Sequence, residues 1–143
     1  MKKFIQYFEI LLVFFVLILA IEYFNQYAKS LAGETFDYTL SSFVHVIGWL
    51  LFGLFLGSLN LISKFKKDGS WQVNKERLLG LGLPLFIILI LYHIMYLEVW
   101  MPQVMVSMLF FIVTKGMIKY IAAFLGYIAI SSLTKKRNAL RVK

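Results

Sequence analysis

The chain has 143 residues, of which 61% are hydrophobic and 15% are charged, and its formal net charge is +8. A soluble domain is about 45–50% apolar and about 25% charged, and a small one leaves much of its surface in water. The composition therefore excludes an ordinary soluble domain and predicts an all-α membrane protein, with residues 1–143 forming a single four-helix transmembrane domain. Cysteine is absent, which excludes disulfides, a thiolate nucleophile and a cysteine metal site.

The first predicted span covers residues 4–24 and contains an uninterrupted apolar run from Ile10 to Ile21. A helix of about 20 mostly apolar residues is long enough to cross the hydrocarbon core of a bilayer. Because Lys2 and Lys3 precede the run, the segment also resembles a cleaved signal peptide loosely. We favour a retained span, because the apolar region of a signal peptide is only about 7–15 residues long.

A short polar loop is expected next, over residues 25–40, and a second span over residues 43–62. The side-chain oxygens of Asp37 and Thr39 both suit the N-cap position of this second helix. Either residue is therefore expected to cap it.

The third span is predicted over residues 78–97, after a basic loop at residues 63–77. The pair Asp68-Gly69 is typical of a tight turn, and Trp71 suits a membrane interface. We therefore expect this loop to form either a small hairpin or a turn that lies on the headgroups. The first turns of the span contain Gly80, Gly82 and Pro84. Proline is tolerated at this position, and a kink of the span is the alternative.

The last apolar stretch runs from Val104 to Leu133 and is interrupted by Lys115 and Lys119. As one straight helix it would be about 45 Å long, well beyond the roughly 30 Å hydrocarbon core. The fourth span is therefore placed over residues 116–133.

The preceding segment, Val99–Thr114, is expected to be helical, with Pro102 in its first turn, where the missing N–H is harmless. The sequence leaves three placements open for it: interfacial, re-entrant or projecting from the membrane.

Lysine and arginine are distributed unevenly between the two sides of this arrangement. Twelve fall on the side that holds both chain ends, whereas the opposite loops hold Lys29 alone, beside Glu34, Asp37 and Glu98. Because cytoplasmic loops carry an excess of Lys and Arg, both ends are predicted to be cytoplasmic, in a multi-pass protein of the cell membrane (the cytoplasmic membrane if the source is bacterial). The cations suit anionic lipid headgroups, and no nucleic-acid partner is expected. The twelve are Lys2, Lys3, Lys64, Lys66, Lys67, Lys75, Arg77, Lys135, Lys136, Arg137, Arg141 and Lys143.

Small residues form two stripes at helical spacing. Helices in lipid associate through close backbone approach, so small residues mark contact faces. The stripes predict either packing between spans of one chain, which we favour, or homodimerisation through the GxxxG motif. The stripe on the second span comprises Gly48, Gly53 and Gly57, and the stripe on the fourth comprises Ala122, Ala123, Gly126 and Ala129.

Ionisable side chains from all four spans are expected in one layer near the outer side. Each is costly inside the hydrocarbon unless it is paired or reaches water. At 100° per residue the lysines share the small-residue face of the fourth span. We therefore hypothesise a polar cluster that is open to the outside and contains an ion pair between Glu22 and Lys119. Its members are Glu22, His45, His93, Lys115 and Lys119.

The favoured alternative is that the lysines extend to the interface and the histidines sit among headgroups. A structural polar cluster and a substrate or ion site are the other two interpretations. Zinc binding by two histidines and a carboxylate has no local ligand spacing to support it, and neither a metal nor another cofactor is predicted. Nearer the inner side, Glu9 and Asn60 are expected to form interhelical hydrogen bonds or to contact lysines of the inner loop, with proton coupling as the alternative for Glu9.

The sequence contains no motif for a serine nucleophile, a zinc protease, a P-loop or a dinucleotide site. We therefore expect no enzymatic activity and assign no catalytic residue. The favoured function is a non-enzymatic accessory, regulatory or immunity-type membrane component that acts through helix packing, as a homo-oligomer or with a membrane-protein partner. The alternative is a small oligomeric transporter or channel subunit that uses the outer polar layer.

Overall fold

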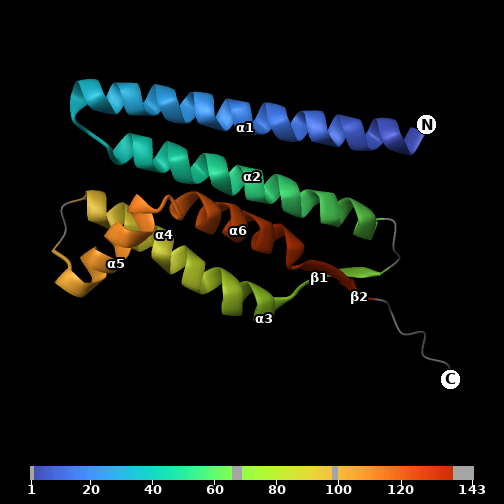
Figure 1. Cartoon of the computed structure of the whole chain (residues 1–143). Helices are drawn as coiled ribbons and strands as arrows, with labels where there is room; N and C mark the ends of the chain where they lie inside the picture. The colour runs from blue at the N-terminus through green and yellow to red at the C-terminus, as the bar shows by residue number, and fades with distance from the viewer. Residues whose placement is uncertain (1, 66–68, 98–99, 137–143) are drawn as a thin grey trace.

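The computed structural model describes residues 2–65, 69–97 and 100–136, and the chain is mostly helical (Figure 1). Three helices are long and apolar enough to cross a membrane, and a bent pair of shorter helices would make a fourth span. Several residues used above lie outside the described ranges: Lys66, Lys67, Asp68, Glu98, Arg137, Arg141 and Lys143.

Helix α1 covers Lys2–Thr35, which is well beyond the predicted span of residues 4–24. Its 34 residues correspond to about 51 Å of helix. The loop expected over residues 25–40 is therefore wrong over most of its length. Hydropathy predicts where an apolar stretch ends, whereas a helix can continue into a polar segment.

One buried face explains why α1 continues past its apolar run. Ile21, Asn25, Ala28 and Ala32 follow one another at spacings of three or four residues and are all buried. Such spacing places them on one side of a helix. The helix ends before Phe36, whose φ of 57° is incompatible with a continued right-handed helix.

Helix α2 covers Thr39–Phe65 and begins four residues before the predicted span of residues 43–62. The chain turns between α1 and α2 over residues 36–38 only. The carboxylate of Asp37 accepts a hydrogen bond from the backbone N–H of Thr39 (2.9 Å). Asp37 therefore satisfies the N–H of the first residue of α2. The N-cap position, which was predicted for Asp37 or Thr39, is held by Tyr38, whose carbonyl accepts from the N–H of Ser42.

The hydrogen bond to Asp37 makes the stability of α2 dependent on pH. The hydrogen bonds from Thr39 hold the pKa of Asp37 below its ordinary value. Because the folded pKa is lowered, the stabilisation is present above the unfolded pKa of about 4 and is lost as the pH falls through the folded pKa. We expect acidification from about pH 6 to pH 3 to lower the melting temperature of the wild type more than that of Asp37→Asn, whose amide oxygen still accepts but does not titrate. Thermal unfolding in detergent over this range measures the difference, and parallel curves would contradict it.

The third predicted span, residues 78–97, corresponds to three helical pieces that follow one another without a loop. They are α3 (Lys75–Arg77), the π-helical turn η1 (Leu78–Gly82) and α4 (Leu83–Tyr96). The π turn ends two residues before Pro84, which has no N–H to donate to the carbonyl four residues earlier. Pro84 lies in the first turn of α4 and the chain stays helical through it, so the proline is tolerated as predicted.

Two short helices follow α4: the first lies within the predicted segment Val99–Thr114, and the second lies within the predicted fourth span of residues 116–133. Helix α5 covers Gln103–Thr114, and α6 covers Ile118–Ser131, bent by 87° from α5. Gly116 makes the bend possible with a φ of 63°. The 14 residues of α6 give only about 21 Å of helix, so α6 reaches the length of a span only together with α5. The separate helical segment before the last helix is confirmed, and its interfacial or re-entrant placement stays a prediction.

A two-stranded sheet joins segments that are far apart in the sequence. Strand β1 (Ser70–Val73) pairs antiparallel with β2 (Leu133–Lys136), and Trp71 lies opposite Lys135. The Lys135 ammonium lies 5.1 Å from the centre of the Trp71 ring. The local hairpin considered for residues 63–77 is therefore wrong, because the partner of β1 follows α6 and only tertiary packing brings it near.

The helices lie side by side in the order α1, α2, α6, α4 (Figure 1). The start of α1, the end of α6 and the sheet lie together at one end, which we call the sheet end. The turn at residues 36–38, helix α5 and the α5–α6 bend lie at the other, the elbow end. This placement agrees with a chain that crosses the same layer four times.

The most extensive helix contact is between α2 and α6, and glycine makes it possible. A Cβ on Gly53 would overlap the carbonyl oxygen of Ala123, and one on Gly126 would overlap the carbonyl oxygen of Leu50. A Cβ on Gly57 would lie 2.7 Å from the Cβ of Ile130. The two small-residue stripes therefore pack against each other within one chain.

Other members of the stripes serve different contacts. Gly48 faces α1, because a Cβ there would lie 3.0 Å from Cγ2 of Ile21, while Ala129 is exposed. We call the α2–α6 contact at Gly53, Gly57 and Gly126 the seam. Next to it, toward the elbow end, lies an apolar core cluster: Val46, Leu89, Tyr92, Ile118 and Ala122.

An interhelical hydrogen bond joins α2 to α6 near the sheet end. The Asn60 amide donates to the hydroxyl of Tyr127 (2.9 Å), which confirms the interhelical bonding predicted for Asn60. Such bonds contribute on average about 0.6 kcal/mol in membrane proteins. We expect a double-mutant cycle of Asn60→Ala and Tyr127→Phe, followed by unfolding in detergent, to give a coupling free energy of about this size. Strict additivity of the two changes would show that the bond contributes nothing.

Candidate functional site

The ionisable residues predicted to form one outer cluster are distributed over the elbow end. Lys119 places its ammonium over the rings of Trp49 (5.8 Å) and Tyr120 (5.1 Å). Glu22 is exposed on α1, and no ion pair between Glu22 and Lys119 is present among the interactions of the described residues. Lys119 is therefore stabilised by aromatic faces in place of the expected carboxylate.

Lys115 lies at the α5–α6 bend and is exposed. Its ammonium is 6.0 Å from the centre of the Phe111 ring, one turn earlier on α5. An exposed lysine at this position suits one that reaches an interface.

His93 on α4 contacts the start of α2. Its ring stacks on Phe43 (4.1 Å between centres), and its Nδ1 lies 3.2 Å from the Ser42 hydroxyl. The Ser42 hydroxyl donates its single proton to the Thr39 carbonyl (2.7 Å). The proton of this contact is therefore assigned to His93 Nδ1, which donates to Ser42 and leaves Nε2 as an acceptor.

A cavity of about 450 Å³ opens at the elbow end, and we call it the elbow cavity. It contains His45 but neither His93 nor Lys119, although Glu22, Lys29 and Lys119 are close enough to act on His45 electrostatically. Its wall is formed by α1, the start of α2, α4 and the α5–α6 bend. The lining residues are Lys29, Tyr38, Ser41, Ser42, His45, Tyr92, Val113, Gly116 and Ile118.

Several polar groups of the elbow cavity have no hydrogen-bond partner within the described ranges. Ser41 is 8% exposed, and its hydroxyl makes no hydrogen bond there. The same holds for the side chains of Lys29, Tyr38 and His45. All four can donate, and no carboxylate lines the cavity, so the site is suited to a ligand that accepts hydrogen bonds.

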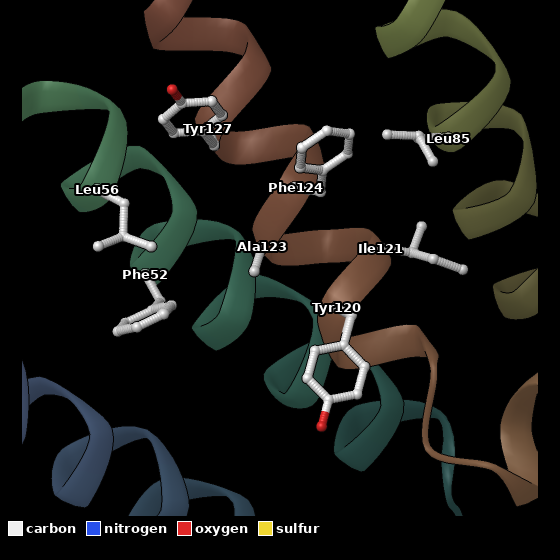
Figure 2. A pocket seen from close by; sticks show the side chains of 8 residues that line it. All are labelled: Phe52, Leu56, Leu85, Tyr120, Ile121, Ala123, Phe124 and Tyr127. Atoms are coloured by element: carbon white, nitrogen blue, oxygen red, sulfur yellow. The ribbon is translucent and has the colours of Figure 1, made fainter. Parts of the chain in front are cut away.

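A second hollow, of about 530 Å³, is a groove on the side of the helix row (Figure 2). Ala123 of α6 forms its floor between side chains of α2 and of α4, and Phe124 projects beside it. The lining is apolar apart from two tyrosine hydroxyls, which suits hydrocarbon such as a lipid acyl chain. Its residues are Phe52, Leu56, Leu85, Tyr120, Ile121, Ala123, Phe124 and Tyr127.

Cations at the sheet end bind helix carbonyls. The Lys64 ammonium donates to the carbonyl of Ser131 (3.4 Å), the last residue of α6, and to that of Leu133 (2.9 Å) in β2. The Lys135 ammonium donates to the carbonyl of Phe65 (3.1 Å), the last residue of α2. Positive side chains at helix C-termini are stabilised by the helix dipole. The basic residues that predict the orientation in the membrane thus also stabilise the ends of α2 and α6.

Glu9, at the same end of the predicted membrane layer, is exposed on α1.

Most residues of the elbow cavity are not predicted from the sequence, because its polarity predicts a loop over residues 25–40. Lys29 and Tyr38 fell inside that loop. A signal was available, however: Ser41 and His45 are four residues apart, which places them on one face of a helix that starts before residue 41. His45 alone of the proposed cluster lines the cavity, and His93 reaches it through Ser42.

Within residues 2–65, 69–97 and 100–136, no group of three His, Cys, Asp or Glu side chains is arranged to hold a metal ion.

Comparisons with known protein families, curated proteins and solved structures find no match to this chain.

Proposed function

We propose that this chain is a four-span protein of the cell membrane with both chain ends in the cytoplasm. The spans would be α1, α2, the continuous α3–α4 helix and the bent α5–α6 pair. The observation that carries this proposal is the gathering of cations at the sheet end, where the positive-inside rule places the cytoplasm. The described cations that lie on the loops and strands of that end or beside them are Lys64, Lys75, Arg77, Lys135 and Lys136.

Within that membrane we propose a non-enzymatic accessory or regulatory role, in which the elbow cavity holds a ligand at the outer side. The closest approach to a catalytic pair in the described chain is Ser42 with His93. Ser42 is buried and gives its proton to the Thr39 carbonyl, while the His93 ring stacks on Phe43. A nucleophile needs an accessible hydroxyl and a base held by a third group, so this arrangement supports binding over catalysis.

A small transporter or channel subunit is the second candidate, because the elbow cavity could admit a solute. Beneath the cavity, however, Val46, Leu89 and Ala122 form an apolar core, and α2 and α6 approach to backbone contact at Gly53. A path through one copy would have to separate these helices. The packing therefore favours ligand binding, and transport would require an oligomer or a rearranged state.

Lipid and a neighbouring membrane protein are the partners we propose. Helix α1 packs mainly against α2, and its other faces carry exposed apolar side chains such as Phe15, Leu19 and Tyr23. Because the GxxxG seam is used inside the chain, a homo-oligomer would use these outward faces or the lateral groove. Anionic headgroups would meet the cations of the sheet end.

Single cysteines test the proposed orientation, because the chain has none of its own. Glu34→Cys, at the exposed end of α1, should react in intact cells with a maleimide that cannot cross membranes. Gln72→Cys, on the exposed strand β1, should react only after the cells are permeabilised. Leu19→Cys, which is exposed but lies in the predicted hydrocarbon layer, should react in neither condition.

The cysteine-free chain sets the background of this experiment. Labelling of Gln72→Cys in intact cells, with Glu34→Cys protected, would invert the topology and end the proposal of an outer ligand site.

A further inference from the structure

We propose that the elbow cavity binds a phosphate oxyanion, carried either by a free solute or by a phospholipid headgroup. The inference rests on the proposed function, in which this cavity faces the outer side of the membrane. It names the chemistry that the cavity would recognise.

Ser41 is the starting point. The residue is more than nine-tenths buried, lines the cavity and makes no hydrogen bond within the described chain. Its oxygen is not among the fully buried polar atoms that lack a partner, so it stays open to the cavity. A ligand that accepts a hydrogen bond can therefore reach this hydroxyl from the cavity.

The other unengaged groups of the cavity determine the sign of that ligand. Lys29 contributes an ammonium from α1, and Tyr38 and His45 contribute donors from the start of α2. Donors of this kind, one of them charged, suit the several oxygens of a phosphate, and hydrogen bonds to charged groups are stronger than neutral ones.

The first turn of α2 adds further donors. Asp37 accepts from the N–H of Thr39, and the N–H of Ser42 donates to the Tyr38 carbonyl. The N–H groups of Leu40 and Ser41 are left without a backbone partner in the described chain. The start of a helix carries partial positive charge and attracts anions.

Asp37 and Glu22 lie outside the lining of the elbow cavity. Glu22 and Lys119 act on His45 from outside that lining with opposite signs. Among the lining residues Lys29 alone carries a formal charge, so the lining itself favours an anion.

Position and size are compatible with both sources of phosphate. The 27 residues of α2 give about 40 Å of helix, longer than the roughly 30 Å hydrocarbon core, so the first turns of α2 can lie at headgroup level. The cavity volume of about 450 Å³ exceeds that of a phosphate group alone, so an organic group attached to the phosphate would also fit. Val113 and Ile118 give part of the lining an apolar surface for such a group.

The test uses the full chain purified in detergent, unfolded thermally in inorganic phosphate and in chloride of equal ionic strength. A second arm uses phosphatidylcholine nanodiscs with and without phosphatidic acid. Lys29→Gln and Ser41→Ala are the cavity variants. Lys75→Gln and Ser107→Ala, both exposed and outside the cavity, are the matched controls.

Phosphate should stabilise the wild type and both controls, and each cavity variant should weaken the apparent affinity at least about tenfold. The same pattern seen only with phosphatidic acid would assign the headgroup as the source. A shift of equal size in all variants, or no shift with either probe, would overturn the inference. If phosphate fails to bind while cysteine labelling places Glu34 on the outer side, only the inferred ligand class is wrong. If the labelling is inverted, the proposed function itself is wrong.

Discussion

Replacing Gly126 with leucine is expected to prevent the chain from reaching a stable folded state. A Cβ at this position would overlap the carbonyl oxygen of Leu50 and lie 2.9 Å from the backbone nitrogen of Leu54. Overpacking usually costs about 1–3 kcal/mol when side chains can move aside. Here the neighbour is backbone of α2, so α2 and α6 must separate, and we expect a loss above about 3 kcal/mol. The measurement is the yield of monodisperse protein in detergent and its melting temperature.

Gly33→Leu is the matched control, because it makes the same chemical change on an exposed part of α1. A Cβ at Gly33 has no atom within 4 Å, so this variant should fold like the wild type. Gly53→Leu should behave like Gly126→Leu, because it meets the Ala123 carbonyl from the other side of the seam. Normal yield and melting temperature for Gly126→Leu would show that the two helices do not depend on this close approach.

The seam was predictable from sequence because the physics behind it is local. Glycines spaced by four residues form a groove on a helix whatever surrounds it, and lipid offers no other reason to keep them on one face. Gly53, Gly57 and Gly126 all lie where this reasoning placed them. The apolar lengths of the second and third spans were recovered within a few residues for the same reason.

Helix ends were less predictable, since they depend on events that hydropathy does not record. Helix α1 continues to Thr35 because its polar segment still buries one face, and the 87° bend between α5 and α6 depends on the positive φ of Gly116. The β1–β2 pairing needs α2 and α6 to end side by side, which is a tertiary fact. No local pattern in residues 63–77 could supply it.

The candidate site shows the same division. The type and depth of His45 predict its place, whereas Lys29 lies beyond the predicted end of the first helix and Ser41 lies before the predicted start of the second. The Glu22–Lys119 pair was chosen from depth alone, and the side chains point to different neighbours: Lys119 meets the rings of Trp49 and Tyr120. Rotation of one helix against another decides such contacts, and composition does not encode it.

Replacing Asn25 with leucine is expected to stabilise the protein. Asn25 is 2% exposed on the face of α1 that packs against α2, and neither its amide nitrogen nor its amide oxygen has a hydrogen-bond partner in the described chain. A buried polar group without a partner costs about 1–3 kcal/mol. Leucine has the same branching at Cγ and no polar atoms, so unfolding in detergent should show a gain within that range.

Two further variants separate this cause from a general gain in hydrophobicity. Gln26→Leu adds a similar apolar side chain at an exposed position and should change the free energy of unfolding by less than about 0.5 kcal/mol. Asn25→Asp keeps the shape but places an unpaired carboxylate in the same buried position, so it should destabilise the protein strongly at neutral pH. If leucine instead lowers stability, the Asn25 amide has a hydrogen-bond partner such as a bound water. The polar groups that bind partners outside the protein would then extend from the elbow cavity into the contact between α1 and α2.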